Sequence, residues 1–556
     1  MMRRTRTASL LATATTVVLA LTACGGSSSG SGNGKVTQGG TLTYLAPQDF
    51  DNLDPQRVYT TEGQNMDELI VRSLTGWEEA PGQTPKLVGD LATDTGTATD
   101  NDTVWTFHLR PGVKYQDGTT VTSYDVKYGV ERIFSPDITG GPGYAAQWLV
   151  GGSSYTGPYQ GKSLASIVTP DASTISFHLN QPVPDFNETT AMPAWSAVPK
   201  AHDTGANYNT GVFSDGPYQI QSYQRGKELI LVRNKYWSQA TDPIREQNVN
   251  EIDMKQGLDP ATIDQELISD SGTAADGIQE WAISGSDLSM EASNPQLKSR
   301  LNVVASPGIS YMALNVNTIK SLPVRQAIEY AVNKVTARGA FGGTAYGDIA
   351  TTMLAPGVAG HKDFNLYSTD PSGDLTKAKA LMAQAGNPKL TLSLATQNLP
   401  SYENWADSIK ASLANIGITV NIVPINASNY FNTMSDTKDQ YDMAWMDWFP
   451  DWPSASTVLP DLFNGAQIKS EPESNQDISY LNDPAVNAQI AKIATMTDLS
   501  AANTAYGNLD EQILGDASVV PLVYMKITEL SGSDVGGLIA DPVNSAINLS
   551  RVYIKQ

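Results

Sequence analysis

Tryptophans and carboxylates alternate in one short segment of the sequence, residues 441–453. The segment holds three of the ten tryptophans of the chain within eight residues, with two aspartates between them: Trp445, Asp447, Trp448, Asp451 and Trp452. An aromatic surface beside a carboxylate can hold an ammonium group, because the carboxylate accepts a charge-assisted hydrogen bond and the ring attracts the cation. These residue types therefore predict a site for a cationic group.

The alternative interpretation of this segment is ordinary core packing, with the acids as turn residues. Trp445, at the end of an apolar strand, fits core packing best. Trp448 and Trp452 stand beside Pro450 and Pro453, in irregular backbone where a large aromatic side chain more often lines a cleft. We therefore expect Trp448 and Trp452 to contribute to a ligand cleft.

Other kinds of chemistry find less support. Asp447 and Asp451, four residues apart, could form the carboxylate pair of a secreted glycosidase, but nearness in sequence says little about nearness in space. No Gly-x-Ser-x-Gly segment stands at a strand-to-helix turn, as a nucleophile elbow requires. The single cysteine excludes a Cys-rich metal site, and the histidines are scattered: His108, His178, His202 and His361. We expect no catalytic residue, no metal and no cofactor.

The composition is that of an acidic globular protein. The 556 residues include 36 Lys plus Arg and 58 Asp plus Glu, which gives a net charge of −22. A chain this acidic, without a cluster of basic residues, is a poor partner for phosphates, so we exclude nucleic-acid binding. At roughly 150 residues per domain, the length predicts about three or four structural units.

The start of the chain has the pattern of an export signal. Residues 1–7 contain three arginines, and the following 8–23 contain no charge. This apolar run is shorter than the roughly 20 residues that span a bilayer. Cys24 follows small residues as in the bacterial lipobox, where the thiol receives acyl chains such as palmitate that hold a protein on a membrane. We expect a signal peptide at 1–23, lipidation of Cys24, and a flexible Gly/Ser tether up to residue 34.

Strand-like and helix-like segments alternate along the rest of the chain. Period-two alternation predicts strands, and apolar residues at helical spacing predict helices. Strands are expected at 41–45, 103–109, 174–179, 229–233, 390–395, 418–424 and 519–525. Helices are expected at 64–73, 123–134, 324–335, 375–385, 402–415, 487–495 and 501–514. The alternation in the second half predicts an α/β lobe, in which the tryptophan-rich segment follows an apolar strand.

Eight short motifs also occur in an order that resembles a known family. They are GGTLTY at 39–44, LDP at 53–55, LTGWE at 74–78, WTFHLRPGVKYQDGTTVTSYDV at 105–126, DGPY at 215–218, LVRNKYW at 231–237, VRQAIEYAVNK at 324–334 and WFPDWP at 448–453. From residue 39 to residue 554 the chain resembles the extracytoplasmic solute-binding proteins of peptide-type ABC importers, the oligopeptide- and dipeptide-binding family 5.

The resemblance implies an α/β fold of two lobes, a periplasmic-binding-protein-like clamshell with an extra subdomain in the larger lobe. The expected boundaries are 35–307 for lobe one, with the subdomain near 76–200, then 308–523 for lobe two and 524–556 for a return to lobe one. Two chain crossings, near 306–311 and 521–526, would form the hinge between the lobes.

The resemblance also implies roles for single residues. Asp451 matches the family aspartate that meets the N-terminal ammonium of a peptide, and Trp448 matches an aromatic residue that stacks in the cleft. Tyr59, Thr60 and Thr61 match the family loop that contacts the peptide backbone. Apart from the resemblance, Trp452 and Trp281 are also expected to bind the ligand. Asn315, a polar residue in the predicted hinge strand, either faces the cleft or is satisfied internally. The sequence departs from the family at Ser454 and Ala455, and in the loop at 280–284, and both departures concern the substrate rather than the fold.

The function expected from these observations is binding without catalysis. A monomeric lipoprotein on the extracytoplasmic face of the cell membrane would capture oligopeptides by lobe closure and deliver them to an ABC permease. The same scaffold could instead bind an oligosaccharide or a metal chelate, because tryptophan-rich clefts suit sugar rings as well as side chains. A secreted carboxylate-dependent glycosidase is the remote alternative.

Overall fold

The computed structural model describes most of the chain beyond its first 35 residues. The described residues are 36–80, 85–280, 288, 290, 293–438, 440–469 and 475–555. The predictions for the signal peptide, Cys24, the tether and Trp281 therefore lie outside the described residues. Within the described ranges, no helix combines the length and the apolar character that crossing a membrane requires.

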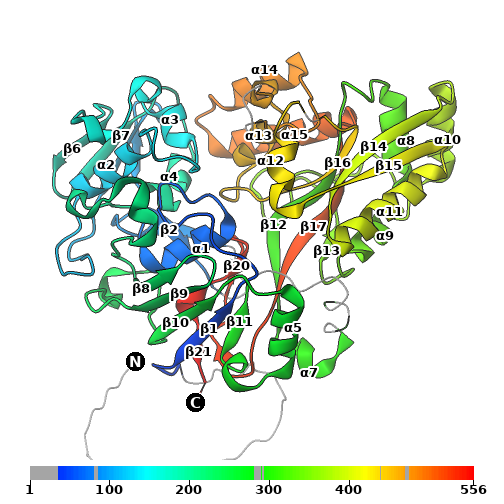
Figure 1. The fold of residues 1–556 in the computed structure, drawn as a ribbon. Helices are drawn as coiled ribbons and strands as arrows, with labels where there is room; N and C mark the ends of the chain where they lie inside the picture. The colour runs from blue at the N-terminus through cyan, green and yellow to red at the C-terminus, as the bar shows by residue number, and fades with distance from the viewer. Residues whose placement is uncertain are drawn as a thin grey trace, which may run out of the picture. The chain divides into compact units, whose positions relative to one another are not determined.

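Five strands form the first sheet, in the lower part of Figure 1. In spatial order they are β11 (Gly277–Gln279), β1 (Thr41–Leu45), β10 (Glu251–Lys255), β9 (Glu228–Arg233) and β8 (Tyr218–Gln224). Strand β1 is parallel to β10 and β11, and β10, β9 and β8 are antiparallel. Helix α1 (Thr61–Ile70), expected at 64–73, buries Met66, Leu69 and Ile70. Helix α5 (Pro260–Ser269) precedes β11.

A four-stranded antiparallel sheet carries an aromatic core. Its strands, in spatial order, are β4 (Thr97–Thr99), β5 (Val104–His108), β7 (Thr174–His178) and β6 (Ile167–Asp171). Trp105 and Phe107 alternate inward on β5, as the period-two pattern predicts. Helix α2 (Ser123–Arg132) starts with a capping box, in which the Asp125 carboxylate accepts hydrogen bonds from the backbone N–H and the hydroxyl of Thr122.

A six-stranded mixed sheet occupies the second half of the chain. Its strands, in spatial order, are β13 (Gly347–Ile349), β17 (Val519–Leu530), β12 (Leu301–Leu314), β16 (Met443–Trp448), β14 (Leu390–Gln397) and β15 (Ile418–Ile425). The predicted strand–helix–strand unit is confirmed, because parallel β14 and β15 are joined by helix α11 (Pro400–Ala414). The tryptophan-rich segment begins on β16 and leaves the sheet at the end of that strand.

The single helix predicted at 324–335 is wrong. The structure has two helices there, α8 (Leu322–Ala331) and α9 (Lys334–Gly339). Val332 between them is extended, and the side chain of Asn333 accepts hydrogen bonds from two backbone N–H groups of the first turn of α9. An asparagine in this position starts a new helix rather than continuing the old one.

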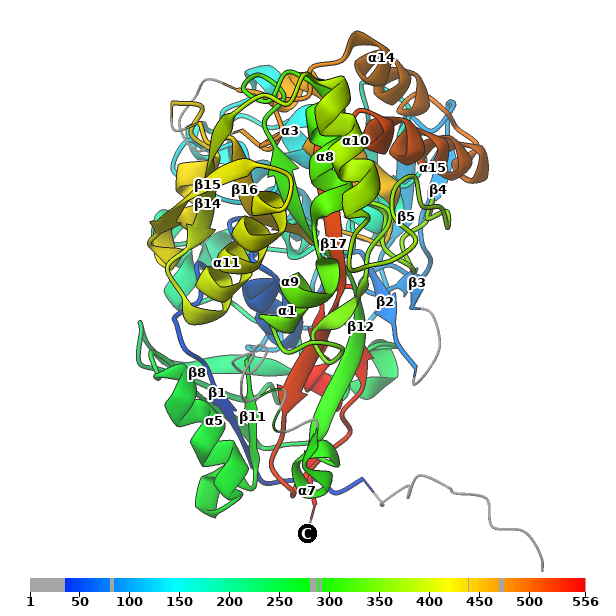
Figure 2. The same ribbon diagram turned by 90° about the vertical axis from the view of Figure 1, so that its right-hand side faces the viewer.

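The long strands β12 and β17 connect the first and the six-stranded sheet regions, and Figure 2 shows them side by side. Both strands belong to the six-stranded sheet, and near one end Val304 and Ile527 pack in the hydrophobic cluster of the first sheet. The pairing register shifts between Ala305 and Ile309. At this irregularity a Cβ on Gly308 would come within 2.5 Å of the Phe449 ring, so the close approach of these two segments requires glycine.

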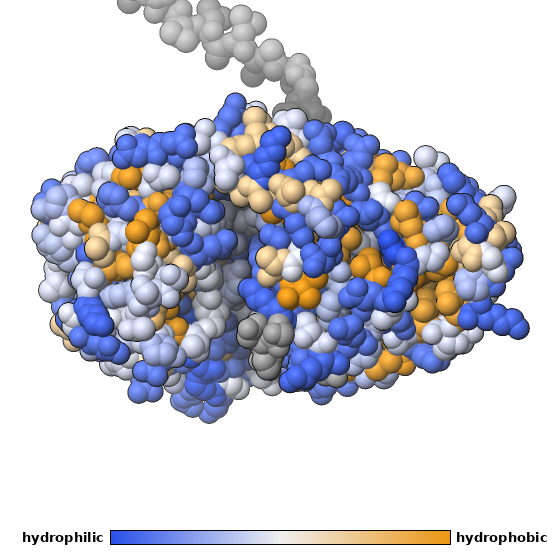
Figure 3. All heavy atoms as spheres, turned by 90° about the horizontal axis from the view of Figure 1, so that it is seen from above, coloured by the Kyte–Doolittle hydropathy of each residue, from blue (hydrophilic) through white to orange (hydrophobic). Residues whose placement is uncertain are grey.

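The remaining elements are short strands and peripheral helices. The strands are β2 (Thr75–Glu78), β3 (Lys86–Gly89), β18 (Val535–Gly536), β19 (Ala540–Asp541), β20 (Ala546–Ile547) and β21 (Tyr553–Ile554). The helices are α3 (Tyr144–Trp148), α4 (Phe186–Thr189), α7 (Pro295–Lys298), α10 (Leu375–Gln384), α12 (Tyr430–Met434), α13 (Leu459–Phe463), α14 (Pro484–Ile493) and α15 (Leu499–Gly515). Seen from above, the surface is hollowed by a groove between the part that carries α2 and α3 and the part that carries α12–α15 (Figure 3).

Candidate ligand-binding site

The Asp451 carboxylate is the point where three distant segments of the chain meet. Asp451 lies just after β16, is half-buried, and accepts a 2.8 Å hydrogen bond at Oδ2 from the hydroxyl of Tyr59. The hydroxyl of Tyr144, from helix α3, donates a second hydrogen bond to the same oxygen. Tyr59 comes from the loop before α1. We call the four-stranded sheet and the helices α2, α3 and α4 that share its hydrophobic cluster the aromatic subdomain. The first-sheet region, the aromatic subdomain and the end of β16 therefore each supply one group.

Burial shifts the pKa of Asp451 and of the neighbouring Asp461 upward. Burial raises the pKa of Asp451 to about 6, although the two tyrosine hydroxyls act in the opposite direction. Burial and the charge of Asp451 raise the pKa of Asp461, on α13, to about 7, and Lys469 offsets part of this shift. A ligand ammonium at Asp451 would therefore meet a carboxylate that is ionised at neutral pH and has no cationic partner among the described residues.

Trp452 is buried rather than open to the groove, with 1% of its surface exposed. Its indole N–H donates to Oδ2 of Asp185 over 3.1 Å, and the ring lies against Tyr144 and Trp148 at centroid distances of 5.0 and 6.4 Å. The hydroxyl of Ser456 donates to the same Asp185 oxygen over 2.6 Å. The prediction that Trp452 lines a cleft is therefore corrected: the indole finds both apolar neighbours and a carboxylate acceptor in the aromatic subdomain.

Trp448 is the half-buried last residue of β16. Its indole N–H donates to the carbonyl of Thr457 over 2.7 Å, and its ring packs against the hydrophobic cluster of the six-stranded sheet. The hydrogen bond fixes the ring orientation three residues before Asp451. The stacking role of Trp448 remains a prediction.

The three predicted loop residues have different surroundings. Tyr59 is 39% exposed and reaches Asp451. The hydroxyl of Thr60 caps α1, because it accepts from the backbone N–H of Gly63 over 3.3 Å and donates to Asp51 over 2.8 Å. Thr61 is half-buried and lines a recess beside α1. Of the three, the structure brings only Tyr59 into contact with Asp451.

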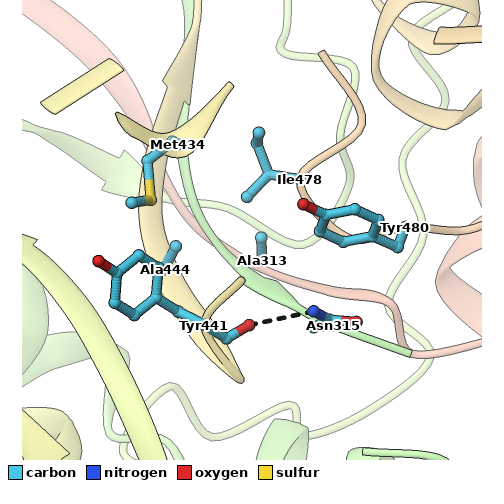
Figure 4. Close-up of a pocket in the computed structure, with 7 residues that line it drawn as sticks. All are labelled: Ala313, Asn315, Met434, Tyr441, Ala444, Ile478 and Tyr480. Atoms are coloured by element: carbon cyan, nitrogen blue, oxygen red, sulfur yellow. Dashed lines mark hydrogen bonds between the residues drawn. The ribbon is translucent and has the colours of Figure 1, made fainter. Parts of the chain in front are cut away.

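Asn315 lies away from Asp451, at the opposite end of β16. Strand β12 pairs Ile309 with Trp448 and Leu314 with Met443, so five residues, or roughly 17 Å, separate the two ends. The side-chain amide of Asn315 donates to the carbonyl of Tyr441 over 3.2 Å. Asn315 lines a small pocket with six other residues, shown in Figure 4: Ala313, Met434, Tyr441, Ala444, Ile478 and Tyr480. The structure thus satisfies Asn315 internally and does not bring it to the other predicted residues.

The two aspartates of the glycosidase hypothesis have different neighbours. Burial and the negative charge of Glu62 raise the pKa of Asp447 to about 7, whereas Asp451 is bound by tyrosine hydroxyls. The described residues also contain no group of three or more His, Cys, Asp or Glu side chains placed to hold a metal ion.

Sequence reasoning missed Tyr144, Asp185 and Ser456. Tyr144 and Asp185 are in segments with no motif, and their contacts span 307 and 267 residues of sequence. Ser456 lies next to the departure noted at Ser454 and Ala455, which is the one signal in the sequence that points to it.

Comparison with known proteins agrees with this architecture. A family model described as "Bacterial extracellular solute-binding proteins, family 5 Middle" matches residues 86–470. The probable D,D-dipeptide-binding periplasmic protein DdpA of Escherichia coli is 26% identical over 470 residues, with 82% of each chain covered. The periplasmic oligopeptide-binding protein OppA of Escherichia coli is 24% identical over 555 residues, with 93% of each chain covered.

Solved structures extend the agreement to the fold. The structure titled "Clavulanic acid biosynthesis oligopeptide binding protein 2" has a TM-score of 0.86 at 30% identity, covering 94% of this chain and 96% of that one. The DppA protein of Helicobacter pylori in complex with the peptide STSA has a TM-score of 0.74 at 21% identity, covering 94% and 99%. The predicted two-lobed α/β fold is confirmed. The chain belongs to family 5 of the bacterial extracellular solute-binding proteins, the substrate-binding proteins of peptide-type ABC importers.

Proposed function

We propose that this protein captures oligopeptides by their N-terminal ammonium group and delivers them to a membrane permease without catalysing a reaction. The observation that carries the proposal is the Asp451 carboxylate, held between Tyr59 and Tyr144 at the meeting of three chain segments. Relatives named for dipeptide and oligopeptide binding support the same class of ligand.

The tyrosine hydroxyls prepare Asp451 for an ammonium ligand. Hydrogen bonds to a charged group contribute about 1.5–3 kcal/mol, more than neutral ones. Tyr59 and Tyr144 both donate to Oδ2 and hold this oxygen in place. An arriving ammonium can donate a hydrogen bond to the carboxylate, and a rotated tyrosine hydroxyl can accept a further hydrogen bond from it.

Ligand contacts made from both sides of the groove would stabilise the closed arrangement. We place the lobes at 35–307 with 524–556 and at 308–523, with the subdomain near 76–200. The register shift between Ala305 and Ile309 falls beside the proposed crossing at 306–311 and supports a hinge there. Because Asp451 and Tyr59 come from different lobes in this division, a ligand touching both favours closure through differential affinity.

Attachment to the membrane is the second part of the proposal. The mature chain would begin at a diacylated Cys24, and residues 25–34 would tether the binding domain near its permease. The binding domain would act as a monomer on the extracytoplasmic face. An oligosaccharide ligand is less well supported, because a sugar ring would need an open tryptophan face and the Trp452 ring packs against Tyr144 and Trp148.

The test compares peptides with and without a free amine. Calorimetric titration of the purified protein with Ala-Ala-Ala-Ala and its N-acetylated form should show binding of the free peptide, weakened by about tenfold or more on acetylation. Asp451→Asn should weaken binding of the free peptide and leave the acetylated form unchanged. Equal affinity for both peptides in the unmodified protein would reject amine capture, and binding of oligosaccharides alone would reject a peptide ligand.

A further inference from the structure

A second group of carboxylates surrounds a recess beside the first turn of α1. We call it the acidic recess and define it by Glu62, Glu280 and Glu529, which line it together with Tyr44 and Thr61. Glu62 belongs to α1, Glu280 follows β11, and Glu529 lies on β17. Three separate segments of the chain thus each contribute one glutamate side chain to the lining of the recess.

Two of these carboxylates are buried without a compensating cation. Glu280 and Glu529 are each 6% exposed. Glu280 accepts a hydrogen bond from the Tyr44 hydroxyl that is long, at 3.5 Å, compared with the roughly 2.5–3.0 Å of such bonds. Glu529 accepts from the backbone N–H of Ile547, and neither glutamate forms an ion pair with a described residue. The undescribed residues between 36 and 555 include no Lys, Arg or His in the sequence.

The electrostatics of the recess favour an incoming cation. Burial and the charges of Glu62 and Glu529 raise the pKa of Glu280 well above its usual range. Burial raises the pKa of Glu529 to about 8. Tyr44 also feels the charges of all three glutamates. Buried acids are normally paired, so a cation supplied by the ligand would complete this arrangement and allow both glutamates to ionise.

The size of the recess narrows the choice of cation. Its free volume is about 10 Å³, close to the roughly 10–15 Å³ that one water molecule needs. An ammonium group is of this size, whereas a guanidinium is a larger planar group. No set of described acids is placed to hold a metal ion, which favours an organic cation.

We propose that the acidic recess receives the ammonium group of a lysine-type side chain of the bound ligand. The inference rests on the proposed capture of the peptide amine by Asp451 and adds a second positive charge to the preferred ligand. A lysine side chain then contributes to affinity through Glu280 and Glu529, whereas a neutral side chain of equal length leaves these carboxylates without a cation.

The position of the recess indicates which ligand residue carries this side chain. Tyr59, which binds Asp451, is three residues before Glu62, so at most roughly 11 Å of chain separates them. The charge of Glu62 also reaches Asp447 on β16, four residues before Asp451. A peptide advances by roughly 3.3 Å per residue when extended. We therefore expect the lysine near the N-terminal end of the peptide, and the test places it at the second and at the third residue.

The test uses peptides that differ by one ammonium group. The purified protein is titrated calorimetrically with Ala-Lys-Ala-Ala and Ala-Ala-Lys-Ala, each compared with the same peptide carrying norleucine in place of lysine. At least one lysine peptide should bind about tenfold more tightly than its norleucine partner. In the double variant Glu280→Gln/Glu529→Gln this ratio should fall below about threefold, whereas the control Glu403→Gln, on the exposed face of α11, should keep it.

A second measurement uses the unmodified protein, so its result does not depend on whether the double variant folds. Because burial raises the pKa of Glu529 to about 8, this carboxyl is largely protonated at pH 7, and binding of the lysine peptide should release about one proton more than binding of the norleucine peptide. Repeating the titration in buffers with different ionisation enthalpies measures this difference.

The outcomes separate this inference from the function on which it rests. Equal affinities and equal proton release for lysine and norleucine peptides would overturn the acidic recess as a subsite and leave peptide capture intact. A lysine preference that persists in the double variant would also overturn it. Failure of every free-amine peptide to bind would reject the proposed function itself.

Discussion

The hydrogen bond from Trp452 to Asp185 connects the segment after β16 to the aromatic subdomain, and its removal should weaken ligand binding. Trp452→Phe deletes the indole N–H that donates over 3.1 Å but retains an aromatic ring against Tyr144 and Trp148. In the proposed division, Trp452 belongs to lobe two and Asp185 to lobe one, so this hydrogen bond forms only when the two lobes are closed.

The expected size of the effect follows from the acceptor. A hydrogen bond to a charged group contributes about 1.5–3 kcal/mol. In this variant Ser456 still donates a hydrogen bond to the same oxygen of Asp185. Because the carboxylate keeps one donor, the lower half of the range of about 1.5–3 kcal/mol applies. Loss of about 1.5 kcal/mol from the closed state weakens the apparent affinity for a peptide by about tenfold.

The assay is calorimetric titration of Trp452→Phe with a free-amine peptide, with Trp405→Phe as the matched control. Trp405 is buried in the core of the six-stranded sheet, and its indole N–H has no hydrogen-bond partner among the residues that the structure describes. Trp405→Phe should therefore lower the melting temperature with little change in Kd. An unchanged Kd for Trp452→Phe, or an equal change in both variants, would refute the reasoning.

Three further perturbations have expected outcomes. Because burial raises the pKa of Asp451 to about 6, its carboxylate becomes protonated as the pH falls through that value. The affinity for free-amine peptides, measured by calorimetric titration, should therefore drop near about pH 6. The variant Asp451→Asn should lack this pH dependence. Arg72→Met removes one of the two guanidinium groups that pair with the buried Asp90, at 2.6 Å, and leaves Arg245 at 2.8 Å as the other partner. Urea denaturation should therefore show a loss of more than about 1 kcal/mol but less than the about 3–5 kcal/mol of a buried charge left with no partner, and a loss below about 1 kcal/mol would contradict the pairing. Cys24→Ser should move the protein from the membrane to the soluble fraction on cell fractionation, and retention on the membrane would reject the lipid anchor.

Local patterns in the sequence located most regular elements of the fold. The strand at β5 and the unit β14–α11–β15 follow from hydrophobic periodicity, which depends on near neighbours. The break between α8 and α9 was missed, because Asn333 acts as a cap only if the preceding chain turns away from the helix axis. Packing of the surrounding chain, rather than local helix propensity, decides where α8 ends and α9 begins.

The sequence predicted fewer features of the candidate site than of the fold. Composition alone pointed to Asp451, since few segments combine tryptophan, proline and carboxylates so densely. Tyr144 and Asp185 become part of the site only through contacts across about half of the chain, which no local pattern records. Trp452 was expected in an open cleft because irregular backbone surrounds it, but tertiary structure supplies both a ring stack and an acceptor for its N–H.

The central claim is that Asp451 meets the N-terminal ammonium group of a peptide. The most direct measurement is a crystal structure of the protein with a bound free-amine tetrapeptide. We predict that the peptide amine lies within hydrogen-bond distance of the Asp451 carboxylate, between Tyr59 and Tyr144. A complex in which both tyrosines still donate to Asp451 and the peptide amine lies elsewhere would contradict the account.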